Sequence, residues 1–144
     1  MTSRATGFII ALALTLIACA SKDQDTVDGR GIDEVAHEAR SFVDELAKNV
    51  GTSPSVAQDV LTDCAPGQKD SGKDLIYSVR VDVAADTTER LQGAIRQEYE
   101  SEGWTASVRK DNDLRLRRDN VTIGATVFAD QGVATVSGTG GCVK

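Results

Sequence analysis

His37 is the only histidine in this chain of 144 residues, and it is the first candidate for acid–base or metal chemistry. Glu34 and Glu38 flank it, so a general base or a metal ligand is conceivable by residue type. Zinc takes about four ligands, and a thiol nucleophile needs an imidazole beside it. The sequence offers neither pattern, and its carboxylates fall in loops, turns and helix starts, where they are expected for structural reasons. We therefore predict a non-enzymatic protein without metal or other cofactor, with His37 exposed on a helix.

The segment from Arg109 to Arg118 concentrates positive charge in a chain whose net charge is −6. Arg115 and Arg117 alternate with leucines, so a strand would point both arginines away from the core. We expect Arg109 on the same outer face of the preceding strand and Arg118 nearby. Guanidinium groups bind carboxylates and phosphates well. These four arginines are the candidate site for an anionic lipid, a wall polymer or an acidic partner. The alternative is a solvated sheet face whose charge is offset by neighbouring aspartates.

The first 21 residues have the three-part layout of an export signal. Arg4 precedes an apolar run from Phe8 to Ile17, and small residues follow. An apolar run of about ten residues is half of what a helix needs to cross a bilayer. The run therefore predicts export and no membrane-spanning helix.

Leu16-Ile17-Ala18-Cys19 resembles the bacterial lipobox, in which an aliphatic and a small residue precede a cysteine. The resemblance implies that the Cys19 thiol receives diacylglycerol and that a signal peptidase cuts before it. Two acyl chains on one residue give stable anchoring, whereas one gives marginal binding. We expect a protein anchored at the extracytoplasmic face of the cell membrane. The alternative is a secreted protein cut near Ala18 or Ala20.

The net charge limits the partners. Removal of residues 1–18 takes away Arg4 and no acid, so the charge changes from −6 to −7. Binding to nucleic acid needs clustered cations that displace counterions, and we expect no such partner. Attraction to anionic headgroups by overall charge is excluded in the same way.

Cys64 and Cys142 remain if Cys19 carries lipid. Disulfides persist outside the cytoplasm, and we predict that these two pair. The alternatives, a metal pair or a nucleophilic thiol, lack the histidines that they need. A crosslink over nearly eighty residues stabilises by about 4 kcal/mol at most in the chain-entropy model. The glycine-rich residues 138–141 lack a following helix that would make them a phosphate loop, so we interpret them as a turn that lets Cys142 reach its partner.

Hydrophobic periodicity predicts the elements. We expect helices over 31–50 and 86–103, and strands over 75–84, 104–109, 114–118, 121–128 and 133–138. A left-handed cap is expected near Gly51, and Asp86 with Glu89 has the form of a capping box. The stretch from Thr52 to Lys73 contains both prolines and several turn-forming residues, and we interpret it as a loop with a helical turn at 55–61.

This order predicts a two-layer α+β domain, with a five-stranded, mainly antiparallel sheet and both helices on one face. A strand–helix–strand crossover makes the first two strands parallel. The last strand then runs opposite to the first and ends where the first begins. This topology places Cys64 and Cys142 at the same end of the sheet.

The chain divides into a signal peptide (1–18), a lipidated cysteine with a flexible polar tether (19–30) and one α+β domain (31–144). It resembles the small lipoproteins of high-GC Gram-positive bacteria in its lipobox, in having ten Arg to six Lys, and in its richness in Ala, Gly, Asp and Val. The resemblance implies anchoring at Cys19, and we carry over no activity from it. We expect a non-enzymatic lipoprotein that binds a protein or an envelope component. The alternative is a carrier of lipid or another small ligand, in a pocket between sheet and helices lined by Ala39, Ala94 and Ala125.

Overall fold

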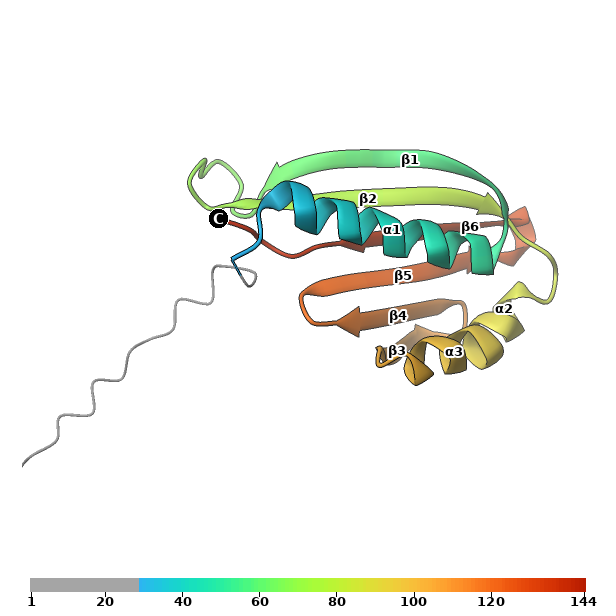
Figure 1. Ribbon diagram of the computed structural model, residues 1–144. Helices are drawn as coiled ribbons and strands as arrows, with labels where there is room; N and C mark the ends of the chain where they lie inside the picture. Colours follow the sequence, from blue (N-terminus) through green and yellow to red (C-terminus); the bar gives the residue numbers. More distant parts are fainter. Residues whose placement is uncertain (1–28) are drawn as a thin grey trace, which may run out of the picture.

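The computed structural model describes residues 29–144. The signal peptide, Cys19 and the tether up to residue 28 lie outside the described residues. The domain is α+β, as predicted: six strands form one antiparallel sheet, and helix α1 packs on β2, β5 and β6 (Figure 1). Within residues 29–144, no helix is both long and apolar enough to span a bilayer.

Helix α1 spans Ile32–Val50, which confirms the first predicted helix. Its buried residues recur at helical spacing and face the sheet. They are Val35, Ala36, Ala39, Val43, Leu46, Ala47 and Val50. The left-handed cap predicted at Gly51 is wrong, because this residue is extended, with φ −161°. Glycine is required there for space: a Cβ atom would lie 2.2 Å from the carbonyl oxygen of Asp82.

The loop predicted over 52–73 is wrong for its first half. Residues Thr52–Asp63 form strand β1, which pairs antiparallel with β2, Lys73–Asp82. The sheet therefore has six strands, not five, and β1 is one of its edges. Nearly every β1 residue is exposed, and the β1–β2 register is interrupted twice. An exposed, irregular edge strand needs no apolar alternation, so the sequence carried no period-two signal there.

The second predicted helix is confirmed in position, with a local departure. It consists of α2 (Thr87–Arg90), a π-helical turn (Leu91–Ile95) and α3 (Arg96–Ser101). The predicted capping box is not formed, because Asp86 makes no side-chain cap hydrogen bond. Leu91, Ile95 and Tyr99 are buried, and they belong to the same core cluster as the apolar face of α1.

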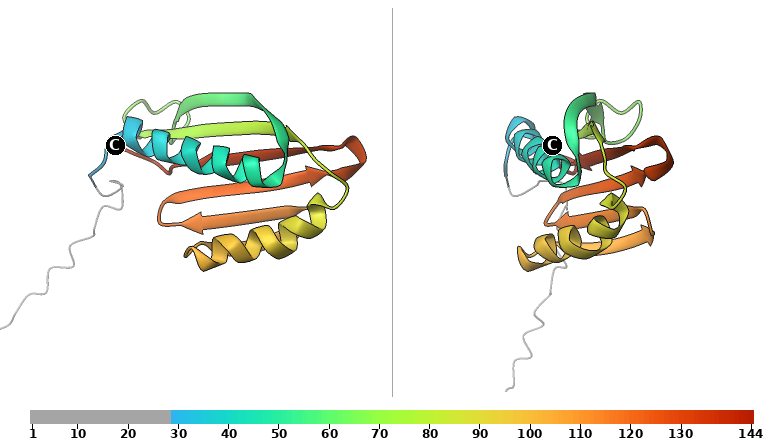
Figure 2. Two further views of the ribbon diagram at one scale, coloured as in Figure 1. Left: turned by 45° about the vertical axis from the view of Figure 1, so that its right-hand side comes forward. Right: turned by 90° about the vertical axis from the view of Figure 1, so that its right-hand side faces the viewer.

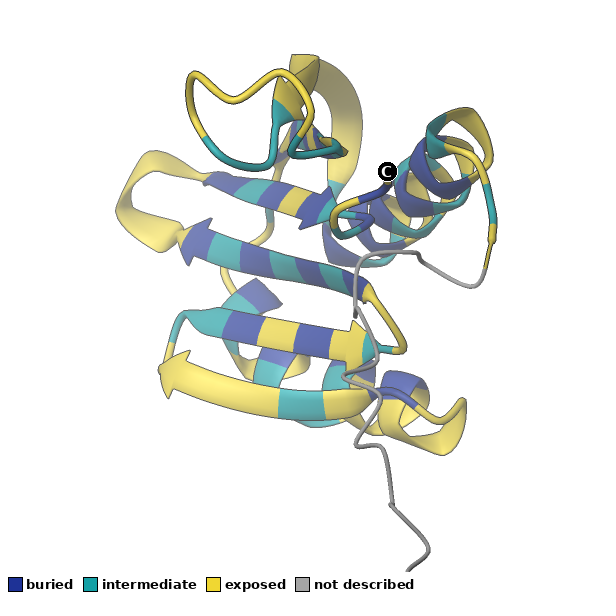
Figure 3. Ribbon diagram, turned by 90° about the vertical axis from the view of Figure 1, so that its left-hand side faces the viewer, coloured by how far each residue is buried: buried dark blue, intermediate teal, exposed yellow. Residues whose placement is uncertain are grey.

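Four strands complete the sheet as a meander. They are β3 (Thr105–Lys110), β4 (Asp113–Arg118), β5 (Val121–Phe128) and β6 (Val133–Thr139). The strand order is β1-β2-β6-β5-β4-β3 with every neighbouring pair antiparallel, so β2 and β3 run in the same direction. The predicted opposition of the first predicted strand (β2) and the last (β6) is confirmed. Along β2, β4, β5 and β6, buried residues alternate with exposed or half-buried ones (Figure 3).

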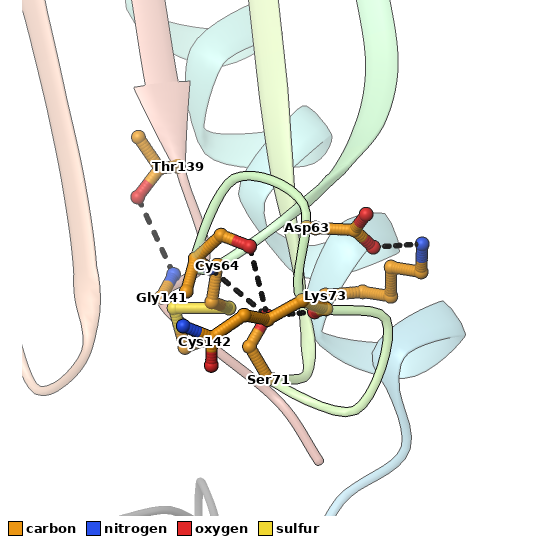
Figure 4. Close-up of a disulfide and its surroundings, with 9 residues drawn as sticks. Asp63, Cys64, Ser71, Lys73, Thr139, Gly141 and Cys142 are labelled. Atoms are coloured by element: carbon orange, nitrogen blue, oxygen red, sulfur yellow. Dashed lines mark hydrogen bonds and ion pairs between the residues drawn. A yellow bond between two sulfur atoms is a disulfide. The ribbon is translucent and has the colours of Figure 1, made fainter.

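The predicted disulfide joins Cys64 and Cys142, whose Cα atoms lie 5.9 Å apart (Figure 4). Next to it, the backbone groups of Lys73 and Val143 exchange two hydrogen bonds, of 2.7 and 2.8 Å. Lys73 also forms an ion pair with Asp63 across the β1–β2 hairpin. The C-terminus thus lies at one end of the domain, together with the start of α1 and the loop of residues 64–72 that connects β1 and β2 (Figure 1).

Substitution of two glycines tests whether Gly51 is required because a side chain has no space there. We expect Gly51→Ala to lower the free energy of unfolding by about 3 kcal/mol, because the new Cβ would collide with the backbone of β2. Gly93→Ala is the control, since a Cβ at this helical position meets no atom within 4 Å. It should raise the free energy by about 0.5–1 kcal/mol. Urea unfolding of both variants measures the difference, and equal effects would contradict the packing argument.

Candidate functional site

The side of the sheet opposite α1, which we call the outer face, carries the chemistry of interest. Cross-strand partners place three rows of side chains side by side on this face. In β2, β6, β5 and β4 these residues are Ile76, Ser78, Arg80, Thr135, Ser137, Thr139, Thr122, Gly124, Thr126, Asp113, Arg115 and Arg117. All of them are exposed or half-buried. The centre of the outer face is therefore rich in hydroxyl groups and is bordered by arginines.

A hollow of about 130 Å³ lies in the middle of this face, over Gly124. Gly124 is opposite Arg115 on β4 and Ser137 on β6. A Cβ atom at Gly124 would lie 2.7 Å from the carbonyl oxygen of Leu114, so the close approach of β4 excludes a side chain. The missing side chain leaves the floor of the hollow as backbone. Its rim includes Arg115, the hydroxyl-bearing Thr122, Thr126, Ser137 and Thr139, and Ile76.

Asp113 borders the same hollow and is only partly satisfied. Its Oδ2 atom accepts a hydrogen bond of 2.9 Å from the Thr126 hydroxyl. Its Oδ1 atom is buried and has no hydrogen-bond partner. The nearest cation is Arg115, whose Nε atom lies 3.9 Å from Oδ1, beyond hydrogen-bond distance. The site thus contains a carboxylate oxygen that lacks a donor next to an exposed guanidinium group.

The structure brings two of the four candidate arginines together. Arg115 and Arg117 are exposed and point to the outer face, as predicted. Arg109 is exposed as well, but it lies at a register irregularity of β3 between Val108 and Lys110. It lines a neighbouring hollow with Lys110 and Phe128, at the end of the sheet away from the disulfide, and this hollow shares Asp113 and Thr126 with the one over Gly124. Arg109 does not line the hollow over Gly124 itself.

The predicted placement of Arg118 beside the other arginines is wrong. Arg118 pairs across the sheet with the buried Val121, so its side chain leaves on the α1 side. Its guanidinium carbon lies 4.7 Å from the ring centre of Phe42 and 4.4 Å from that of Trp104. This cation–π arrangement joins α1 to the start of β3. Successive residues of a strand point to opposite faces of the sheet, so the alternation alone places Arg118 and Arg117 on different faces.

The remaining candidates from the sequence fall at separate places. His37 is exposed on α1, as predicted. In the part of the chain that the structure describes, no group of three or more His, Cys, Asp or Glu residues could hold a metal ion. Ala39 and Ala125 are buried in the core, whereas Ala94 is exposed on the π-helical turn. The three alanines therefore do not form the wall of a common pocket.

Polar contacts between α1 and the β1–β2 edge were not predicted from the sequence. Arg40 donates three hydrogen bonds of 2.7–3.1 Å to the carboxylate of Asp59 on β1. The Tyr77 hydroxyl donates a 2.9 Å bond to Asp44. Burial, followed by the bond to Asp44, raises the pKa of Tyr77 to about 12. The contact of Arg40 depends on strand β1, whose residues carry no periodic pattern in the sequence.

No family model, curated protein or solved structure matches this chain. A fold does not by itself specify a function, so the chemistry of the residues on the outer face carries the functional argument.

The two buried tyrosines predict a loss of stability at high pH. Burial is the main cause that raises the pKa of Tyr99, like that of Tyr77, to about 12. Because the folded state holds these protons more tightly than the unfolded chain, whose tyrosines titrate near 10, their contribution is full below pH 10. It is lost as the pH rises to 12, by up to roughly 2–3 kcal/mol for each residue.

Tyr77→Phe isolates one of these contributions. The variant should be less stable than wild type near pH 8 by about 1 kcal/mol, because the bond to Asp44 is lost. Its free energy of unfolding should then fall less steeply than that of wild type between pH 10 and 12. Urea unfolding at a series of pH values measures both slopes. Parallel curves would show that Tyr77 does not titrate with a raised pKa.

Proposed function

We propose that this chain is a lipoprotein anchored through Cys19 at the extracytoplasmic face of the cell membrane. Its α+β domain is non-enzymatic and binds a component of the cell envelope through the outer face of the sheet. The signal peptide, the lipid on Cys19 and the tether belong to this proposal, since residues 1–28 lie outside the described part.

The observation that carries the binding role is the contrast between the two faces of the sheet. The face toward α1 is a closed apolar core, whereas the centre of the outer face carries Arg115 and Arg117 beside a hollow lined with hydroxyl groups. We also infer that the second helical segment covers the same face as α1, because Leu91, Ile95 and Tyr99 join its core cluster (Figure 2). Both helical segments then leave the outer face free for a ligand.

The placement of the chain ends supports display of this face from an anchor. The start of α1 and the C-terminus lie at the disulfide end of the domain, and the sheet extends away from that end (Figure 1). Ten peptide units separate Cys19 from Gly29. They reach at most about 35 Å. An anchor at Cys19 would therefore keep the start of the domain within this distance of the membrane, and nothing in the described part of the domain covers the centre of the outer face.

The anchor is tested by intact-mass analysis of the protein from membranes of the cells that naturally produce it. We expect the mass of a chain that begins at Cys19, increased by diacylglycerol. Cys19→Ser should abolish the added mass and the recovery in the detergent-extracted membrane fraction, because the thiol that accepts lipid is gone. An unmodified wild-type chain that is released into the medium would refute the anchor.

The binding role is tested by cosedimentation of the purified full-length protein with insoluble wall fragments from the same cells. We expect wild type to sediment and the double variant Arg115→Gln/Arg117→Gln to sediment at least fivefold less, because the cations of the outer face are removed. Arg109→Gln/Arg90→Gln removes the same charge from exposed positions elsewhere and should sediment like wild type. Equal sedimentation of both double variants, or none by wild type, would contradict a site on the outer face.

A further inference from the structure

We propose that the hollow over Gly124 binds a carboxylate-bearing sugar of a glycan chain. The inference rests on the proposed function and specifies the ligand of the same face. Three features of the site define this chemistry: a cation, a ring of hydroxyl groups and a carboxylate oxygen without a donor. Each selects a different part of the ligand.

The cation selects an anionic group. Arg115 stands at the rim of the hollow with about half of its side chain exposed. The nearest carboxylate among the described residues is that of Asp113, whose Oδ1 atom lies 3.9 Å from the Nε atom of Arg115. This distance is too long for a hydrogen bond, so the guanidinium group does not form a bidentate pair with this carboxylate. Arg117 is two residues further along the same strand and points to the same face. A carboxylate above the hollow would take the donors of Arg115 and lie close to a second positive charge.

The hydroxyl groups select a polyhydroxylated ligand over a protein. The sides of the hollow carry Thr122, Ser137 and Thr139, whose hydroxyls both donate and accept hydrogen bonds as those of sugars do. Protein interfaces instead concentrate aromatic and apolar side chains at their centre. Of the large apolar residues exposed on the outer face, Val60 on the edge strand and Phe128 at the far end are peripheral. Ile76 borders the hollow, so the hollow combines one exposed apolar side chain with its hydroxyl groups.

The carboxylate of Asp113 excludes a simple anion. Its Oδ1 atom lacks a hydrogen-bond donor, and Arg115 is its nearest cation. A ligand carboxylate that draws Arg115 away weakens the ion pair of Arg115 with Asp113, and a ligand hydroxyl that donates to Oδ1 would compensate for this loss. Polyphosphate and sulfate present only acceptors at neutral pH, whereas an acidic sugar offers hydroxyl donors beside its carboxylate. The pair Asp113–Arg115 thus matches a ring that carries both groups.

The size of the hollow indicates that it binds one group of a longer glycan chain. Pockets that enclose a whole small molecule usually measure about 300–1,000 Å³. The hollow over Gly124 measures about 130 Å³ and is open to solvent. It therefore accepts part of one sugar ring, and the rest of the glycan would extend along the sheet toward Arg117 or Arg80.

The test uses the full-length lipidated protein in detergent and three soluble probes at physiological salt concentration. Polygalacturonate carries hydroxyls and carboxylates, its fully methyl-esterified form keeps the hydroxyls without the charge, and polyphosphate keeps the charge without the hydroxyls. We expect polygalacturonate to bind at least tenfold more tightly than either of the other probes. Biolayer interferometry measures the three affinities.

Two variants locate the binding, and a third controls for charge. Arg115→Gln should weaken polygalacturonate binding at least tenfold, and Arg109→Gln, which removes the same charge outside the hollow, should change it less than twofold. Ser137→Phe places an aromatic ring across from Gly124, an arrangement that stabilises glycine positions in sheets. This variant should keep the melting temperature of wild type or exceed it, yet lose binding at least tenfold because the ring fills the hollow.

Several outcomes would overturn the inference. Polyphosphate binding as tight as that of polygalacturonate would assign the site to phosphate groups. An Arg109→Gln defect equal to that of Arg115→Gln would indicate attraction by charge alone, and full binding by Ser137→Phe would place the ligand elsewhere. If polygalacturonate does not bind but the wall fragments still do, the glycan assignment fails while the proposed function stands. If neither binds, both fail.

Discussion

The structure depends on the close packing of α1 against the middle of the sheet. At the end of β6 this contact is so close that side chains are excluded: a Cβ atom at Gly138 would lie 2.6 Å from Val43, and one at Gly140, just after the strand, would lie 2.4 Å from Val35. The glycine-rich residues 138–141 therefore do more than turn the chain toward Cys142. They let the helix approach, and this approach buries the apolar residues of β2, β5 and β6. The core is a single layer on one face of the sheet, and it also includes Leu91, Ile95 and Tyr99 of the second helical segment.

A single core layer explains the bonds at the disulfide end. A domain of this size buries a modest fraction of its surface, so covalent and polar links contribute a larger share of its stability. Cys64–Cys142 and the Lys73–Val143 backbone pair hold the C-terminal segment against the start of β2. Arg40 and Asp59 similarly hold the exposed strand β1 to the helix. These links all lie on or beside the α1 side of the sheet, and the centre of the outer face takes no part in them.

Sequence patterns predicted the elements that have a buried side. The helix at 32–50 and the strands β2 and β5 were identified because half of their residues pack against the core, which imposes a period. Strand β1 escaped prediction for the converse reason, since it buries almost nothing and its register is broken. The crossover topology followed from element order alone, and it correctly placed the two cysteines together.

The candidate site was only half predictable. The alternation of apolar and polar residues in β4 predicted that Arg115 and Arg117 point away from the core. The hollow depends on which residues lie opposite each other on neighbouring strands, and the sequence of a single strand does not contain this information. One signal was present: Gly124 interrupts a strand rich in β-branched residues, and such a glycine often marks a close backbone approach. The partly satisfied carboxylate of Asp113 had no such signal, because its hydrogen-bond partner Thr126 lies on the neighbouring strand β5.

The separation of Arg117 from Arg118 changes how an acidic domain can attract an anion. The sequence suggested a patch of four arginines, whereas the structure commits Arg118 to Phe42 and Trp104 and leaves two arginines on the outer face. At physiological ionic strength, interactions between exposed charges are screened beyond about 8 Å. The net charge of −6 therefore has little weight at the hollow compared with Arg115 and Arg117. With so few cations, hydrogen bonds from the surrounding hydroxyl groups must supply much of the affinity, and this requirement favours a sugar over a bare anion.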